Sequence, residues 1–211
     1  MSIFSELTSK IREINLGHPI RVGVSGITGC GKSTFADHLA ESLRKSGRKV
    51  TRGSIDWFHN PRSKRYERGK KSAEGYYLDA HDYNAFKKTF LEPLGSPAPY
   101  RYSLSSHDLE RDIPATGNLL VADPDEIFIV DGTFLFKEQL LSLWDYRIFL
   151  DTKFEVALER GVSRDQVRLG GRQEAIDFYQ NRYHKACQFY LGEHNPKASA
   201  DIIVSNNDRA L

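Results

Sequence analysis

The sequence predicts an α/β fold, with a doubly wound, mostly parallel sheet that carries helices on both faces. Apolar runs of strand length alternate along the chain with segments whose apolar residues recur three and four positions apart, as in amphipathic helices. With 211 residues, of which 39% are hydrophobic and 27% charged, the chain has the size and composition of one globular domain. We expect a single domain over residues 1–211, with an N-terminal helix (1–17), a small hairpin-like insertion (about 95–124) and an arginine-bearing lid (about 160–173).

The first elements read as helix, strand, loop, helix and strand. Residues 3–14 show helical spacing of apolar side chains, and Gly17–Pro19 ends that helix. Residues 20–24 form a short apolar run that predicts a buried strand, and a helix over 35–47 follows a glycine-rich loop. Residues 49–55 predict the second strand.

The middle of the chain is more polar. The basic stretch 62–71 has little to bury, so it is either a solvated loop or a segment that closes over an anion or substrate. A helix over 83–92 with Asp82 as its N-cap follows, and residues 95–123 predict the polar, hairpin-like insertion.

The strand and helix alternation then returns. The expected elements are a strand at 127–130, a helix at 137–143, a strand at 146–150, helices at 153–167 and 173–191, and a last strand at 201–204. This alternation supports the parallel sheet.

A glycine-rich motif carries the strongest functional signal. Gly26-Ile27-Thr28-Gly29-Cys30-Gly31-Lys32-Ser33 matches GxxxxGK[ST] between a predicted strand and a predicted helix, which predicts a P-loop NTPase fold. In such a loop backbone N–H groups surround phosphate oxygens, the lysine reaches the terminal phosphates and the serine hydroxyl binds Mg²⁺. We therefore predict ATP and Mg²⁺ as cofactors, with ATP bound by residues 26–34, Thr34 included.

Two aspartates follow predicted strands. Asp131 ends an apolar strand and fits the second ligand of Mg²⁺, beside Ser33. Asp56 lies just beyond the second strand, where a carboxylate could take the proton of an attacking hydroxyl. Gly132 stands where many ATP-driven motors have a water-activating glutamate, and no guanine-reading Asn-Lys-x-Asp tetrad occurs, so a motor or GTPase is disfavoured.

Arginines recur every four residues late in the chain, at Arg160, Arg164, Arg168 and Arg172. Like charges at this spacing repel unless an anion lies between them, and a triphosphate would supply one. We assign Arg164 and Arg172 to charge stabilisation during transfer and Arg168 to ATP binding, with Gly170–Gly171 as the hinge of a closing lid. Pairing with nearby carboxylates on a solvated helix face is the alternative.

Charge and cysteine content limit the partners. The net charge of +2 is too balanced for a protein that coats nucleic acid or a membrane, and no signal peptide or membrane span is expected. Only two cysteines are present, Cys30 and Cys187, which fits a cytoplasmic protein. His184 and Cys187 lack a second ligand pair with zinc spacing, and a homo-oligomer is left open.

Several segments together resemble the uridine kinase and phosphoribulokinase family, from about Arg21 to Asn206. They are VSGITGCGKSTFADHLA, IDWF, IVDG, IFLDT, SRD, GGR and ADIIVSN. The resemblance implies that Asp56 in IDWF is the catalytic base. A phosphoribulokinase proper would be longer.

The uridine kinase branch suggests an acceptor pocket. There, an aspartate before a helix contacts the ribose, which nominates Asp79, and a tyrosine and histidine five residues apart lie by the base, which nominates Tyr102 and His107. Tyr100 could replace Tyr102 in this match. Phe58 is a further candidate for the pocket lining, with packing in the core as the alternative.

Departures from the family pattern concern the acceptor more than the phosphate donor. Asp131 replaces the usual glutamate, Gly161 follows Arg160 where a second arginine is common, and Trp57–His59 replaces the usual aromatic order. We expect a kinase that phosphorylates the 5′-hydroxyl of uridine or cytidine. The alternatives are another small acceptor (nicotinamide riboside, pantothenate or a sugar) or an ATP-dependent switch that binds a macromolecule.

Overall fold

The central element of the molecule is a five-stranded sheet in which every neighbouring pair is parallel. The computed structural model describes residues 2–116 and 119–208. In spatial order the strands are β2 (Val50–Ser54), β7 (Ile127–Gly132), β1 (Ile20–Gly26), β8 (Tyr146–Asp151) and β9 (Ile202–Ser205). All residues of β1 and β7 are buried, as expected for central strands covered on both faces. The predicted α/β fold of the P-loop NTPase type is therefore confirmed.

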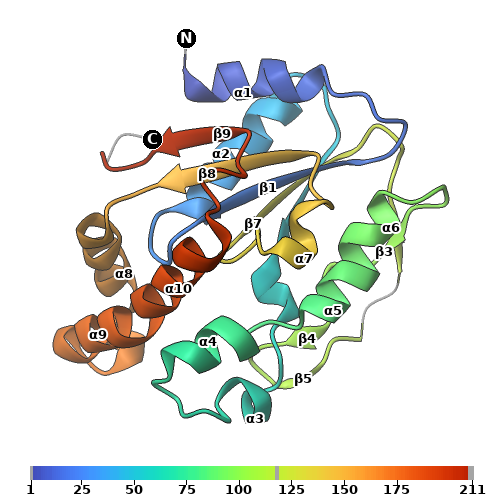
Figure 1. The fold of residues 1–211 in the computed structure, drawn as a ribbon. Coiled ribbons are helices and arrows are strands. Elements are labelled where there is room, and N and C mark those ends of the chain that lie inside the picture. The colour runs from blue at the N-terminus through green and yellow to red at the C-terminus, as the bar shows by residue number, and fades with distance from the viewer. Residues whose placement is uncertain (1, 117–118, 209–211) are drawn as a thin grey trace.

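Helices cover both faces of this sheet (Figure 1). On one face lie α1 (Ile3–Arg12) and α2 (Lys32–Lys45), joined by packing of the Phe4 and Phe35 rings, whose centroids are 5.0 Å apart. A hydrogen bond of 2.7 Å between the hydroxyls of Thr8 and Ser42 adds a second link.

The other face is covered by α10 (Lys185–His194), α7 (Glu138–Leu141) and the helical segment from residue 83 to 94 (Figure 1). Tyr190 of α10 is fully buried, and its hydroxyl lies 3.2 Å from the Ser25 hydroxyl and accepts from the Phe136 N–H at 2.9 Å. The tyrosine thus ties α10 to the end of β1.

The segment after Asp82 is one helical unit in three parts. These are α5 (Tyr83–Ala85), the π-helical turn η2 (Phe86–Leu91) and α6 (Glu92–Leu94). The Asp82 carboxylate accepts from the Ala85 N–H at 2.9 Å, so the predicted N-cap is confirmed. The helix ends at Leu94, just past Pro93.

Short elements connect these layers. They are the 3₁₀ turn η1 (Ile55–Phe58), α3 (Arg62–Arg65), α4 (Ala73–Asp79), and two antiparallel pairs, β3 (Arg101–Tyr102) with β6 (Leu120–Val121) and β4 (His107–Asp108) with β5 (Ile113–Pro114). Residues 117–118, inside the expected hairpin-like insertion, lie outside the described residues.

Two consecutive helices precede α10. Helix α8 (Phe154–Leu169) ends at Gly170, whose φ of 95° is in the left-handed region that favours glycine, and α9 (Arg172–Phe178) starts two residues later. The π-helical turn η3 (Tyr179–His184) joins α9 to α10. Among residues 2–116 and 119–208, no helix has both the length and the apolar character needed to cross a membrane.

Candidate active site

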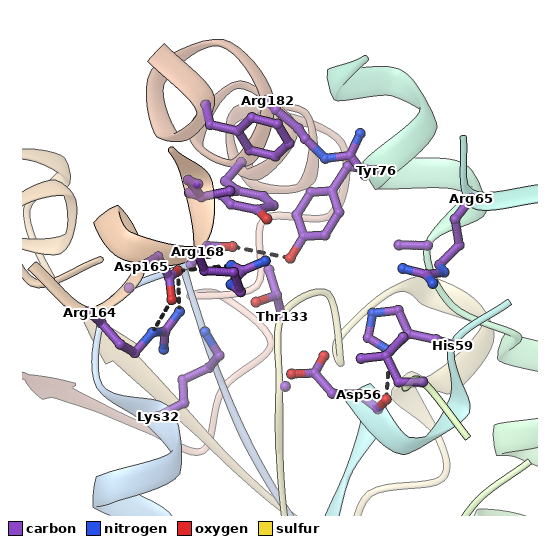
Figure 2. Close-up of a pocket in the computed structure, with 18 of the residues that line it drawn as sticks. Lys32, Asp56, His59, Arg65, Tyr76, Thr133, Arg164, Asp165, Arg168 and Arg182 are labelled. Atoms are coloured by element: carbon purple, nitrogen blue, oxygen red, sulfur yellow. Dashed lines mark hydrogen bonds and ion pairs between the residues drawn. The ribbon is translucent and has the colours of Figure 1, made fainter. Parts of the chain in front are cut away.

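A cavity of about 900 Å³ opens at the carboxyl ends of β1, β2 and β7 (Figure 2). It is bounded by the glycine-rich loop, by α8 to η3, and by the segment from Asp56 to Ala80. Ligands of open α/β sheets bind at this edge, because the loops that follow neighbouring parallel strands meet there. Its size suits a nucleotide together with a small molecule.

The glycine-rich loop forms one wall. Gly29 and Gly31 have φ values of 88° and 94°, which only glycine adopts without strain, and a Cβ at Gly31 would lie 2.9 Å from Asn206 Nδ2. The Lys32 ammonium donates to the Ile27 carbonyl at 2.8 Å, so the lysine folds back over the loop. Backbone at this turn is open to the cavity, the arrangement that phosphate binding needs.

The nine predicted ATP-binding loop residues divide into two groups. Thr28, Gly29, Gly31, Lys32, Ser33 and Thr34 line the cavity. Gly26, Ile27 and Cys30 do not line it, because Gly26 ends β1 and the other two side chains are buried in the core. Burial raises the pKa of the Cys30 thiol, which fits a packing role.

Ser33 and Asp131 lie together at the cavity edge, as the predicted pair of Mg²⁺ ligands requires. The Ser33 hydroxyl donates to Asp131 Oδ2 at 2.7 Å, while Arg52 donates to Oδ1 at 2.8 Å and holds the carboxylate in place. Hydroxyl and carboxylate oxygens are the donor atoms that Mg²⁺ prefers. The residues present therefore fit the ion.

Asp56 follows β2 in η1 and points into the cavity, where 64% of its side chain is exposed. His81, which is almost fully buried, places Nε2 3.2 Å from Asp56 Oδ1. The cavity walls partly desolvate Asp56 and so disfavour its charged form, but the hydrogen bond from His81 outweighs this and holds the pKa of the carboxyl well below its usual range. Asp56 is therefore ionised at neutral pH.

His59 lies beside this pair. Its Nδ1 is 2.6 Å from the Asp56 carbonyl oxygen, which can only accept, so Nδ1 carries the proton. Burial, together with the neighbouring His81 at 4.6 Å between ring centroids, lowers the pKa of His59 to about 4. His59 is thus neutral at pH 7. Neither histidine was singled out from the sequence: His59 carries no motif, and His81 reaches Asp56 only because residues 59 and 81 pair.

The arginines that recur every four residues from Arg160 to Arg172 do not share one environment. Arg164 and Arg168 line the cavity, and both pair with the buried Asp165, at 2.9 and 3.4 Å. Asp165 also accepts from the Tyr179 hydroxyl at 2.7 Å. Arg172 belongs to the next helix because Gly170 ends α8, and it pairs with Glu159 at 2.9 Å outside the cavity lining.

The predicted acceptor residues lie elsewhere. Phe58 and Tyr102 are buried, packed against Phe90 with ring centroids 5.9 and 6.0 Å away. His107 is buried and its Nε2 lies 3.0 Å from Asp112 Oδ1, while Asp79 pairs with an arginine of the basic stretch. None of these four side chains lines the cavity.

Other residues take their place at the cavity. The basic stretch contributes Arg62, Arg65, Tyr66, Lys70 and Lys71, and α4 and η3 contribute Tyr76 and Arg182. The basic stretch was visible in the sequence as a segment that could meet an anion. Arg182 and Tyr76 carried no local signal, because each looks like an ordinary residue of a helix.

Comparisons with known proteins agree with this geometry. The profile of the phosphoribulokinase / uridine kinase family matches residues 21–209. Uridine-cytidine kinase B of Dictyostelium discoideum is 25% identical over 194 residues, which cover 89% of this chain and 74% of that protein. A uridine kinase of Borrelia garinii subsp. bavariensis is 27% identical over 195 residues, covering 90% of this chain and 89% of that protein.

A solved structure, described as a possible uridine kinase from Bacillus stearothermophilus, superposes with a TM-score of 0.75. It covers 95% of this chain and 96% of its own, at 24% identity. At this identity the likeness supports the fold.

Proposed function

This chain belongs to the phosphoribulokinase / uridine kinase family and is a phosphotransferase that acts on an alcohol, and from that premise we propose that it transfers the γ-phosphoryl group of ATP, with Mg²⁺, to a hydroxyl held beside Asp56. The observation that carries the proposal is the placement of Asp56. An ionised carboxylate faces Lys32 and the glycine-rich loop across one cavity (Figure 2). A kinase needs this pairing of phosphate site and hydroxyl acceptor.

The donor side stabilises negative charge. The backbone of residues 28–34 and the Lys32 ammonium would bind the triphosphate, and Arg164 and Arg168 would contact it from α8. Ser33 and Asp131 would hold Mg²⁺, which when bound neutralises charge on the phosphate oxygens. Positioning and charge stabilisation supply most of the catalysis in phosphoryl transfer.

The acceptor side orients a hydroxyl. Asp56 accepts a hydrogen bond from the substrate and takes its proton as the new P–O bond forms. His81 fixes the carboxylate, since its Nε2–H donates to Oδ1 at 3.2 Å. We infer that the walls formed by Tyr66, Tyr76 and Arg182 exclude water, so that hydrolysis of ATP stays slow.

The names of the relatives make uridine and cytidine the first acceptors to test, and we expect the 5′-hydroxyl to be the group phosphorylated. Nicotinamide riboside, pantothenate and sugars are alternative acceptors, because the residues expected at a nucleoside do not line the cavity. A cavity of about 900 Å³ favours a small molecule over a macromolecular partner.

The test measures ADP release from Mg²⁺-ATP across these acceptors, with a blank lacking acceptor. Asp56→Asn should bind ATP like the unmodified protein and lower turnover by about 10²- to 10⁴-fold, because the proton acceptor is lost. Asp125→Asn removes an exposed carboxylate outside the cavity lining and serves as the matched control. Near-normal turnover in Asp56→Asn would refute the role of this carboxylate.

A further inference from the structure

One wall of the cavity is strongly cationic. This basic wall is made of two segments, the stretch after β2 and the turn η3, and consists of Arg62, Arg65, Lys70, Lys71 and Arg182. Figure 2 shows Arg65 to the right of Asp56 and Arg182 above it, while Lys32, Arg164 and Arg168 lie to the left. Arg65 and Arg182 of the basic wall therefore lie apart from the cations that face the phosphate loop.

Among the described residues, the basic wall has fewer carboxylate partners than the donor side. Asp165 pairs with both Arg164 and Arg168. In contrast, the carboxylate partner of Arg65 is 3.8 Å away, at Asp112. Within residues 2–116 and 119–208, the other four cations of the basic wall form no ion pair. A concentration of unbalanced charge in a cavity attracts an anion.

Arg182 shows the unbalanced charge of the basic wall most clearly, because it is buried, with 4% of the residue exposed. Its Nη1 donates to the carbonyl oxygens of Lys70 and Ser72 at 2.7 and 3.1 Å, but its Nε has no partner among the described residues. Its guanidinium carbon lies 5.5 and 5.2 Å from the ring centroids of Tyr66 and Tyr76. The rings offset part of the cost of burying the charge, and burial still lowers the pKa of Arg182.

We propose that the acceptor of this kinase is a hydroxy compound that carries an anionic group, a carboxylate or a phosphate, and that the basic wall binds this group while the hydroxyl lies at Asp56. The inference rests on the proposed function and names the class of its acceptor. A neutral nucleoside would leave the basic wall unbalanced. Lys32, Arg164 and Arg168 would pair with the phosphates of ATP at the glycine-rich loop, which leaves the basic wall for the acceptor.

Binding of matched pairs of compounds tests the anion directly. Each pair differs only in charge, as in glycerate and glycerol, pantothenate and pantothenol, and ribose 5-phosphate and ribose. Calorimetry is run with Mg²⁺-ADP at saturation, so that the phosphate loop is filled and cannot bind the probe. We expect the anionic member of at least one pair to bind about tenfold more tightly or better, as one charge-assisted hydrogen bond allows.

Substitutions in the basic wall test where the anionic group of the acceptor binds. Lys70→Gln combined with Lys71→Gln removes two exposed charges of the basic wall without touching the core, so folding is retained. This variant should weaken binding of the anionic probe by about tenfold and leave the KM for ATP unchanged. Lys64→Gln is the matched control, because Lys64 is an exposed lysine of the same stretch that does not line the cavity. It should change neither value.

Four results would overturn the inference. The first three are equal binding of both members in every pair, an anion preference that survives the double substitution, and a double variant that raises the KM for ATP instead. The fourth is fast, Asp56-dependent phosphorylation of uridine or cytidine that does not change when Lys70 and Lys71 are both replaced by glutamine. It would overturn the inference while supporting the proposed kinase. Failure of the kinase itself is recognised separately, as an absence of ADP release with every acceptor.

Discussion

At the scale of single residues, the environment of Asp56 determines what kind of catalyst it can be. A carboxyl whose pKa lies below its usual range is a weak base at neutral pH, so it takes up a proton only late in the reaction. Phosphoryl transfer through a loose transition state requires little early proton removal. The hydrogen bond from His81 therefore suits a carboxylate whose main task is to orient the hydroxyl.

The pH dependence of His81→Ala tests this relation. Asp56 must be ionised to act, and because His81 lowers its pKa, activity should persist as the pH falls through the usual carboxylate range. Without His81 this favourable interaction is lost and the pKa of Asp56 returns toward the ordinary carboxylate value, so the acid limb of kcat/KM should move to higher pH by about one unit or more. His81→Gln keeps a donor at a similar position and should restore part of the shift. An unchanged acid limb in His81→Ala would contradict the role of the hydrogen bond.

Local motifs made some site residues predictable from the sequence. Residues that reach the site only through long-range contacts were not predictable in this way. Lys32 and Ser33 belong to a motif whose function depends on its own backbone, so the sequence was sufficient to find them. His81 and Arg182 reach the cavity only because distant segments pack together. Tyr102 was misleading, since a tyrosine at a suitable spacing fills the core here instead.

At the scale of elements, the loop between β1 and α2 depends on backbone conformation. Gly31 and Gly47, at the two ends of α2, have φ values of 94° and 87°. A Cβ at Gly31 would meet Asn206, while a Cβ at Gly47 would meet nothing within 4 Å. The two glycines share the same strain but only Gly31 belongs to the cavity, so they form a matched pair.

Gly31→Ala and Gly47→Ala should therefore differ in ligand binding more than in strain. Each should destabilise the fold by about 1 kcal/mol, because alanine is strained at positive φ, with a further loss at Gly31 from the contact with Asn206. Only Gly31→Ala should weaken ATP binding. Urea unfolding and ATP titration measure the two effects, and normal ATP affinity in Gly31→Ala would contradict the assigned loop.

The predictability of elements follows their pattern of burial. Strands β1 and β7 are continuous apolar runs, and α1 has a clear apolar face, so their positions were predictable. The short pairs β3–β6 and β4–β5 contain two residues per strand, too few for a periodic pattern. Their pairing depends on the surface on which they pack.

At the scale of the whole molecule, the alternation of strands and helices predicted a parallel sheet but not its strand order. In the structure β7 lies between β2 and β1, although it follows β2 by more than seventy residues in the chain. This order brings Asp56, Asp131 and the glycine-rich loop to one cavity. The sequence could place each of them after a strand, whereas their proximity depends on the order of the sheet.

Two arginines fasten neighbouring strands of this sheet in the same way. Arg21 of β1 donates its backbone N–H, Nε and Nη2 to the Asp145 carboxylate, at 2.8, 2.9 and 2.8 Å. Arg147 of β8 makes the same three bonds to Asp201, at 2.7, 3.1 and 2.9 Å. The pairs differ in burial, since the side chains of the first are 8% and 8% exposed and those of the second 28% and 33%.

This difference in burial predicts that the same substitution lowers the free energy of unfolding by unequal amounts in the two pairs. Arg21→Met leaves the Asp145 charge buried with no opposite charge and only the backbone N–H of residue 21 as a donor, so it should lower the free energy of unfolding by about 3–5 kcal/mol. Arg147→Met leaves Asp201 in contact with water and should lower the free energy of unfolding by about 1 kcal/mol or less. Urea denaturation of both variants makes the comparison, and Arg21→Met combined with Asp145→Leu should recover part of the loss, because no charge then stays buried alone. Equal losses in the two single variants would mean that the shared geometry, and not burial, sets the contribution of these pairs to the sheet.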